Sequence, residues 1–273
     1  MLNIRYQYKP FNYFIIYIFI LCYFVSCTTV KSHSQQDNLY VIIASGHVEK
    51  PHNKCDSKGA LSHNNIYEYK FNDSIVKLFE QYENRLDFVI YDLIYATENF
   101  GLKERVKYVN QSKPDLYIEI HHDSAQIKDI KKANQEGINS KLWNHIKGFS
   151  LHYSEMNKSS FESKIFSSIL ANHLKKIENF IPNLYHADYE KMICIDRSLG
   201  LYNRIKPNGL YVLYNIKSPS IVVECGTIVN PTEEIMLNKL SIKQQIVRAI
   251  NESIYCTKIL LINNRKYKPI KYQ

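Results

Sequence analysis

The chain has 273 residues, 45% of them hydrophobic, which is enough for one sizeable core and for one domain or two small ones. Its formal net charge of +9 favours an anionic partner, such as a nucleic acid, a membrane surface or a bacterial wall polymer. The sequence has no aromatic–basic RNA-binding signature and no DNA-reading helix, so we expect no nucleic-acid partner.

The N-terminal residues 1–27 have the pattern of an export signal. Arg5 and Lys9 precede an apolar stretch at 14–25, and the small residue before Cys27 resembles a lipoprotein processing site. An uncleaved membrane anchor and a signal that is cleaved without lipid attachment remain as alternatives. All three interpretations place the rest of the chain in the cell envelope, outside the cytoplasm. We expect a lipoprotein, periplasmic or attached to the outer membrane, which contacts the membrane through its lipid or anchor.

The remaining sequence predicts a polar linker at 28–38, one domain at 39–256 and a basic tail at 257–273. Apolar runs predict strands at 39–44, 85–94, 115–121, 148–154, 210–215 and 220–226. Apolar residues at helical spacing predict helices at 64–84, 102–109, 161–177 and 235–254. Because strands and helices alternate, we expect an α/β fold, with a largely parallel twisted sheet flanked by helices in a single catalytic domain. A polar insertion at 126–147 has no clear pattern.

Three of the predicted strands end in residues that bind metal ions or move protons. His47 follows the first strand, His121 ends the third, and Glu224 lies near the end of the last. In open α/β sheets the ligand site lies beyond the carboxyl ends of the strands, so we expect these side chains to converge. Glu68 precedes Phe71 by about one helical turn, which places its carboxylate on the inward face, where it needs a partner. The alternative is an exposed first-turn glutamate that the helix dipole favours.

Adjacent strand residues point to opposite faces, so only one of His121 and His122 can join this group. Together with His47 and Glu68 it would form a set of two histidines and one glutamate, which suits one catalytic zinc ion with an open position. Glu224 would then be a general base, since zinc lowers the pKa of water toward about 7 and a carboxylate can take the proton. The set indicates metal-assisted hydrolysis of an amide or ester. Histidines that only form structural hydrogen bonds are the alternative.

Four stretches, in the same order, resemble the zinc-dependent N-acetylmuramoyl-L-alanine amidases of the amidase-3 family: VIIASGHVEK, NNIYEYKFND, DLYIEIHHD and VECGTIVNPTEE. The resemblance covers about residues 39–254. It implies that His47, Glu68 and His121 hold one zinc ion and that Glu224 is the catalytic glutamate. The implied reaction is hydrolysis of the amide between N-acetylmuramic acid and L-alanine of the peptidoglycan stem peptide.

The sequence departs from the family pattern at three places, none of which removes a ligand or the base. Ala44 and Ser45 precede the Gly-His pair, Glu119 replaces a serine, and residues 226–228 lack the usual phenylalanine. Arg105 lies in LKERVKYVN, a stretch that matches a helix of the family. It could contact a carboxylate of the stem peptide or form a structural ion pair.

Two further residues are weaker candidates for substrate contact. His122 could face the substrate or form a hydrogen bond nearby, with a solvent-facing side chain as the alternative. Arg197 lies in MICIDRSLG, which could border the cleft. The departures keep open a zinc peptidase or another amidohydrolase, and a non-catalytic peptidoglycan-binding protein is the alternative of another class. Peptidoglycan is the expected partner, and an unidentified activator protein stays open.

The four cysteines that follow Cys27 fit no zinc-binding or CxxC motif. Outside the cytoplasm they can pair or remain free thiols, and the sequence gives no connectivity for Cys55, Cys194, Cys225 and Cys256. Strand alternation turns Cys225 away from the side of Glu224, which predicts a packed thiol.

Overall fold

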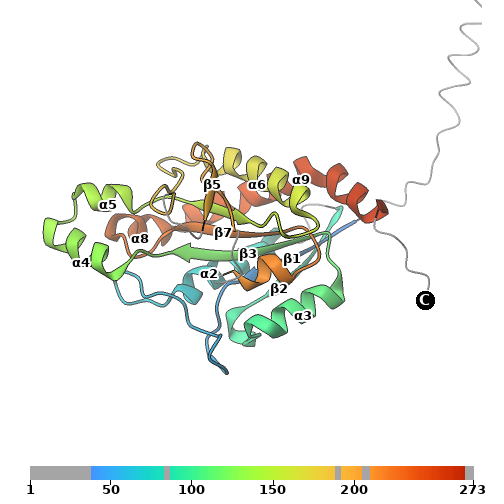
Figure 1. Cartoon of the computed structure of the whole chain (residues 1–273), viewed down its shortest axis with the longest axis horizontal. Helices are drawn as coiled ribbons and strands as arrows, with labels where there is room; N and C mark the ends of the chain where they lie inside the picture. The colour runs from blue at the N-terminus through green and yellow to red at the C-terminus, as the bar shows by residue number, and fades with distance from the viewer. Residues whose placement is uncertain (1–37, 83–86, 188–191, 205–209, 268–273) are drawn as a thin grey trace, which may run out of the picture. The chain divides into compact units, whose positions relative to one another are not determined.

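The structure, a computed structural model, describes residues 38–82, 87–187, 192–204 and 210–267 (Figure 1). The predicted export signal at 1–27 and residues 28–37 of the predicted linker lie outside this part of the chain. None of the helices within the described residues is long and apolar enough to cross a membrane.

The core of the domain is one mixed sheet with the strand order β2-β1-β3-β7-β4-β6-β5. The first four strands in this order are parallel, β4 is antiparallel to β7, β6 is parallel to β4, and β5 is antiparallel to β6. The predicted α/β fold is therefore confirmed, and its parallel half carries the predicted site. The strands are β1 Leu39–Ser45, β2 Val89–Ile94, β3 Leu116–Asp123, β4 Ser150–Tyr153, β5 Ile193–Asp196, β6 Leu201–Asn203 and β7 Ser220–Thr227.

Helices cover both faces of the sheet, and Figure 1 shows α6 and α9 on one side and α3 on the other. The larger apolar core fills the side of α2, α6 and α9, and a smaller one lies under α3 and α7. The α-helices are α2 Glu68–Val76, α3 Leu102–Ser112, α4 Ile127–Glu136, α5 Lys141–His145, α6 Ser160–Leu174, α7 Tyr211–Asn215, α8 Pro231–Leu237 and α9 Leu240–Tyr267. The 3-10 helices are η1 Lys77–Tyr82 and η2 Ala96–Glu98.

Residues 210–215, which we predicted as a strand, form helix α7 instead. Val212, Leu213 and Ile216 are buried against the smaller core. Such a short apolar run fits a buried helix as well as a strand, and the apolar pattern alone does not separate them. The short strands β5 and β6 were not predicted, and they extend the sheet beyond β4.

The predicted C-terminal helix at 235–254 is two helices, because α8 ends at Leu237 and α9 begins at Leu240. Helix α9 also continues to Tyr267, through most of the segment expected to be a basic tail. Its later turns bury Leu261 and expose Ile259.

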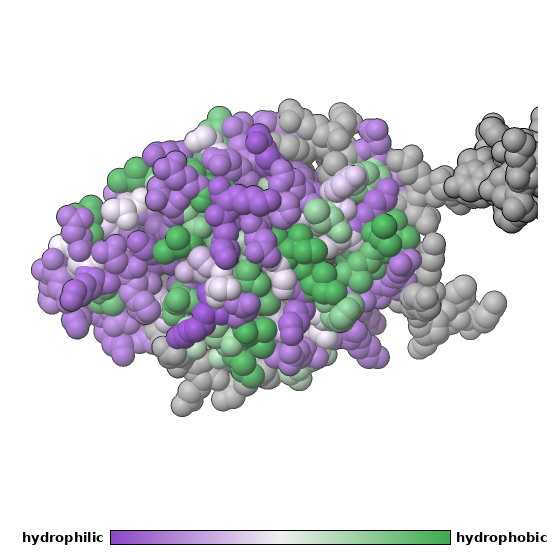
Figure 2. Space-filling model, turned by 90° about the horizontal axis from the view of Figure 1, so that it is seen from above, coloured by the Kyte–Doolittle hydropathy of each residue, from purple (hydrophilic) through white to green (hydrophobic). Residues whose placement is uncertain are grey.

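Seen from above, polar side chains cover much of the domain surface and apolar ones lie between them (Figure 2).

The polar insertion at 126–147 folds into α4 and α5. Ala133 and Trp143 of these helices form a small core with Tyr185 and Val229. The predicted helix at 64–84 is α-helical only to Val76 and continues as the 3-10 helix η1, while residues 83–86 lie outside the described part.

Candidate metal centre

His47 reaches the site from the loop that follows β1. Its backbone has a φ of 68°, in the left-handed region, which is uncommon for a residue other than glycine. The preceding Gly46 leaves room for the site, because a Cβ atom there would lie 2.3 Å from the ring of His121. The Gly-His pair therefore serves close packing of two imidazole rings at the end of the strand.

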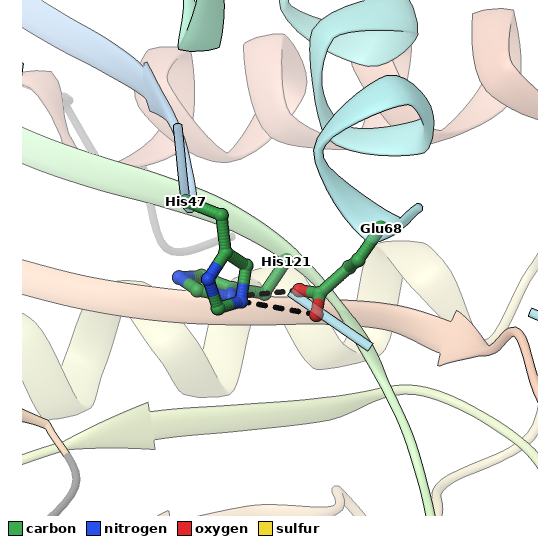
Figure 3. A group of neighbouring side chains, drawn as sticks. All are labelled: His47, Glu68 and His121. Atoms are coloured by element: carbon green, nitrogen blue, oxygen red, sulfur yellow. Dashed lines mark hydrogen bonds and ion pairs between the residues drawn. The ribbon is translucent and has the colours of Figure 1, made fainter. Parts of the chain in front are cut away.

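Glu68 is the first residue of α2 and is only 4% exposed, so the predicted inward orientation is confirmed. Its Oε2 lies 3.0 Å from Nε2 of His47, and its Oε1 lies 3.0 Å from Nδ1 of His121 (Figure 3). The backbone N–H groups of Ala60 and His122 also donate to the carboxylate, at 3.1 and 3.2 Å. A buried carboxylate thus joins a histidine of the loop after β1 to a histidine of β3.

The ligand atoms of His47, Glu68 and His121 all lie within 4.8 Å of one another, so the three side chains could hold one metal ion. The outer nitrogen of each ring is also engaged: Nδ1 of His47 lies 2.8 Å from Ser57 Oγ, and Nε2 of His121 lies 3.4 Å from Glu119 Oε1. Two histidines and one carboxylate are a donor set that catalytic zinc uses. The residues present therefore fit the predicted ion.

The charges of the three side chains support one another. Burial alone would raise the pKa of Glu68, but His47 and His121 outweigh it and hold that pKa well below its usual range. Burial alone would lower the pKa of His121, but Glu119, Glu68 and Glu224 outweigh it and raise that pKa well above its usual range. The pocket between these groups therefore favours positive charge.

Glu224 lies next to His121, because the parallel ladder pairs the two residues directly. Its Oε2 is buried and has no hydrogen-bond partner among the described residues. Burial raises the pKa of Glu224 well above its usual range, Asp123 and Glu68 add to the rise, and His121 opposes it. The strand brings a carboxylate that favours its protonated form to the edge of the candidate metal site.

An irregularity in the ladder follows Glu224 at once. The register between β3 and β7 shifts after His121, and Gly226 has a φ of 129°. A Cβ atom at Gly226 would lie 2.9 Å from the side chain of Leu237 on α8. Irregularities of this kind re-aim side chains at sites, and glycine makes this one compatible with the helix that packs on it.

The loop between His47 and Glu68 also holds a glycine that the site requires. Gly59 has a φ of 79°, and a Cβ atom there would lie 2.6 Å from Glu68 and 2.7 Å from His47. Neither a larger side chain nor an ordinary backbone conformation fits at this position.

A cavity of about 260 Å³ opens beside the two histidines. Its walls are the loop after β1, the start of α3 and α7, and its lining residues are His47, Val48, Cys55, Asp56, Ser57, Leu102, Arg105, Glu119, His121, Leu210, Tyr211 and Val212. The candidate metal site therefore borders a space that part of a substrate could enter.

The structure gives different positions to the three weaker substrate candidates. His122 is 2% exposed on the opposite face of β3, where it lies 2.7 Å from Asn72 Oδ1 and its ring packs on Phe71. Burial lowers its pKa to about 3, so it is a neutral core residue. The predicted hydrogen bond nearby is confirmed, and the alternative of a solvent-facing side chain is wrong. Arg105 is buried in an ion pair with Glu119, and Arg197 is exposed in the turn between β5 and β6, outside the residues that line the cavity.

Sequence reasoning noticed Glu119 as a departure but did not place it in the site. Glu119 precedes His121 by two residues on β3, so strand alternation puts both side chains on the same face. This spacing is the signal that could have placed Glu119 in the site. Ser57 and Gly59 lie in a loop without periodic pattern, so the sequence carried no comparable signal for them. Cys55, Cys194, Cys225 and Cys256 form no disulfide among the described residues, and Cys225 is buried as expected.

Comparison with known proteins adds a family and a set of similar folds. A profile of the family described as N-acetylmuramoyl-L-alanine amidase (Amidase_3) matches residues 41–256. No curated protein sequence matches the chain.

The fold is similar to that of the N-acetylmuramoyl-L-alanine amidase from Clostridium difficile 630, with 18% identity, a TM-score of 0.58, and 82% of this chain and 98% of that chain covered. The apo form of the amidase Ami1 from Mycobacterium abscessus has 19% identity and a TM-score of 0.61, over 80% of this chain and 97% of that chain. The CwlD amidase from Clostridioides difficile, in complex with the GerS lipoprotein, has 20% identity and a TM-score of 0.53, over 82% of this chain and 100% of that chain.

Proposed function

Because the chain belongs to the N-acetylmuramoyl-L-alanine amidase family (Amidase_3), it is a peptidoglycan hydrolase, and we propose how its residues divide the work of cleaving the bond between N-acetylmuramic acid and L-alanine. The observation that carries the proposal is the meeting of His47, Glu68 and His121 beside Glu224 at the carboxyl edge of the parallel strands. Three ligands and one free carboxylate are the groups that metal-assisted amide hydrolysis needs.

His47, Glu68 and His121 would hold a single zinc ion. When bound, zinc supplies Lewis acidity, which polarises an amide carbonyl and lowers the pKa of water to about 7. The site is arranged for a positively charged ion, since two histidines keep Glu68 ionised and both imidazole rings are fixed at their outer nitrogens.

Glu224 is the general base in this proposal. Its Oε2, which has no hydrogen-bond partner in the described part of the chain, accepts the proton of the attacking water, and the same carboxyl group later gives that proton to the nitrogen of the leaving L-alanine. The positive charge of a bound zinc ion would favour the ionised form of Glu224, and the burial that raises its pKa would make that carboxylate a stronger base.

The test is digestion of purified peptidoglycan with zinc or with a chelator, followed by mass spectrometry of the released products. We expect intact stem peptides with a free N-terminal L-alanine, and only in the zinc sample. Shorter peptides cut at another bond would instead support a zinc peptidase. Binding to the wall without any release, in a sample that contains stoichiometric zinc, would support a non-catalytic binding protein.

We also propose that the protein is exported and attached to the membrane through lipid on Cys27. The basic residues Arg5 and Lys9, the apolar stretch and the small residue before Cys27 support this proposal. A Cys27→Ala chain should lose palmitate label and leave the membrane fraction. Unchanged membrane attachment would favour an uncleaved anchor, and a wild-type chain that is never labelled and is found free would favour plain secretion.

An activator protein is a further part of the proposal. The structural neighbour CwlD was solved in complex with the GerS lipoprotein. Pull-down of the exported chain from its own cell envelope, with hydrolysis measured before and after removal of bound proteins, would test this part. Equal activity of the purified chain alone would remove the need for an activator.

A further inference from the structure

We propose that Glu119 is a positioning residue for the metal site: its carboxylate, anchored by Arg105 and Tyr117, fixes the imidazole of His121 and so raises the affinity of the site for its metal ion. The inference rests on the metal site of the proposed function. In this arrangement Glu119 is a buried charge that neither binds the metal nor takes the proton of the attacking water.

Glu119 is buried in the sheet beside the ligand histidine. It is 2% exposed on β3, two residues before His121 and on the same face of the sheet. Its Oε1 contacts Nη1 of Arg105 and lies 3.4 Å from Nε2 of His121, and its Oε2 accepts a hydrogen bond from the hydroxyl of Tyr117 at 3.0 Å. Two partners hold the carboxylate, so its direction toward the ring is determined by the fold.

The two ring nitrogens of His121 face different carboxylates. Nδ1 faces Glu68 at 3.0 Å and is the atom directed at the ligand cluster. When Nδ1 is a ligand, the remaining proton of the ring resides on Nε2 and is donated to Glu119. A carboxylate that accepts from the outer nitrogen of a ligand histidine fixes the tautomer and the ring plane and makes the ligand nitrogen more basic.

The two ligand histidines differ in this respect. The outer nitrogen of His47 meets the neutral hydroxyl of Ser57 at 2.8 Å, whereas that of His121 meets a carboxylate. The charged partner has the larger effect on ligand basicity. Glu119 should therefore matter more for metal binding than Ser57.

Arg105 connects this arrangement to the other histidine. Its Nη2 donates to the backbone carbonyl of His47 at 2.9 Å and to that of Phe100 at 3.3 Å, while Nη1 holds Glu119. One buried guanidinium thus fixes the backbone that carries His47 and the carboxylate that orients His121. The pair acts as a common support under two of the three ligands.

The experiment measures zinc affinity of the full chain by competition with a chelator of known affinity. Glu119→Gln keeps the shape of the side chain and removes its charge, and we expect zinc to bind about 10- to 100-fold more weakly. Ser57→Ala should weaken binding less than Glu119→Gln. Glu233→Gln is the matched control, because Glu233 is a buried glutamate that accepts from the backbone of Gly148 and Thr227 and should leave zinc affinity unchanged.

A second variant keeps the inference testable if Glu119→Gln does not fold. Tyr117→Phe removes one hydrogen bond to Glu119 and leaves both charges of the ion pair in place, and we expect zinc to bind several-fold more weakly. The visible spectrum of the cobalt-loaded variants should also change, because the ring of His121 is less well oriented. A purely structural role would lower thermal stability without changing either readout.

The outcomes separate this inference from the proposed function. A wild-type chain that does not bind zinc would overturn the proposed metal site. A wild-type chain that binds zinc and hydrolyses peptidoglycan, together with wild-type zinc affinity in folded Glu119→Gln or, if that variant is unfolded, in Tyr117→Phe, would overturn only the role of Glu119.

Discussion

The two sides of the site hold their carboxylates in opposite ways. On the side built from β1, β3 and α2, both oxygens of Glu68 lie 3.0 Å from histidine nitrogens, and its pKa is far below the usual range. On the side of β7, Oε2 of Glu224 is buried without a hydrogen-bond partner among the described residues, and its pKa is far above the usual range. The first side is arranged for a fixed positive charge, and the second is arranged to take up a proton. One fold thus assigns different chemistry to two identical side chains.

The largest effect that tests this contrast is loss of turnover on the β7 side. Glu224→Gln keeps the size of the side chain and cannot accept the proton of water, so we expect hydrolysis of peptidoglycan to fall by about 10²- to 10⁴-fold. Zinc content, measured on the same sample by elemental analysis, should remain one ion per chain. Turnover close to that of the wild type would remove Glu224 from the mechanism.

The next effect concerns the close packing on the ligand side. Gly59→Ala places a Cβ atom 2.6 Å from Glu68, and we expect the free energy of unfolding to fall by about 2 kcal/mol more than in Gly137→Ala. Gly137 is a matched control because it also has a positive φ, of 91°, but a Cβ atom there meets nothing within 4 Å. Urea unfolding measures both, and chelator competition should show weaker zinc binding only in Gly59→Ala. Equal losses in the two variants would mean that the ligand side is not tightly packed.

A smaller effect has opposite signs on the two sides. In metal-free protein at neutral pH, Glu68→Gln should lower the free energy of unfolding by about 1 to 3 kcal/mol, because it leaves buried hydrogen-bonding groups with a weaker partner. Glu224→Gln should raise the same quantity by about 1 kcal/mol, since it removes a carboxylate whose ionised form is costly to bury. Urea unfolding in the presence of a chelator measures both changes. Destabilisation of similar size in both variants would contradict the contrast.

The last effect is a pH dependence on the β7 side. His152 on β4 is buried, and burial followed by the charge of Arg204 lowers its pKa well below the usual range. Below about pH 6.5 the unfolded chain therefore binds a proton that the folded chain does not, so stability is lost as the pH falls, by up to about 1.4 kcal/mol per pH unit.

His152→Gln cannot titrate and should flatten this acid limb in urea unfolding measured from pH 7 to pH 5. The exposed His63 provides the matched substitution, His63→Gln, which should leave the slope of the wild type unchanged. If the free energy of unfolding falls as steeply with pH in His152→Gln as in the wild type, groups other than His152 cause the loss of stability in acid.

Simple rules predicted His47, Glu68 and Glu224 at the centre of the site and narrowed the fourth residue to His121 or His122, and the family resemblance then selected His121. His47, His121 and Glu224 follow or end apolar runs that were predicted as buried strands, and Glu68 lies one helical turn from a buried aromatic residue. These are local patterns, and the carboxyl edge of a parallel sheet brings their members together.

The remaining features depend on contacts that local patterns do not contain. Helix α7 was predicted as a strand because its apolar run is too short to reveal a period, and its burial under α3 comes from the tertiary fold. The ion pair of Arg105 and Glu119 joins a helix to a strand, and neither residue alone identifies its partner. Ser57 and Gly59 lie in a loop that packs directly on His47 and Glu68, and these contacts leave no local pattern in the sequence.

The direct pairing of His121 with Glu224 also constrains how the chain can vary. Nearly a hundred residues separate β3 from β7 along the sequence, yet backbone hydrogen bonds between neighbouring strands fix the two side chains to each other. We therefore expect that the intervening segment can gain or lose residues without disturbing their spacing. A single residue inserted before His121 in β3 or before Glu224 in β7 would turn one of the two side chains to the opposite face. We therefore expect homologous chains to differ in length between β3 and β7 and not within these two strands.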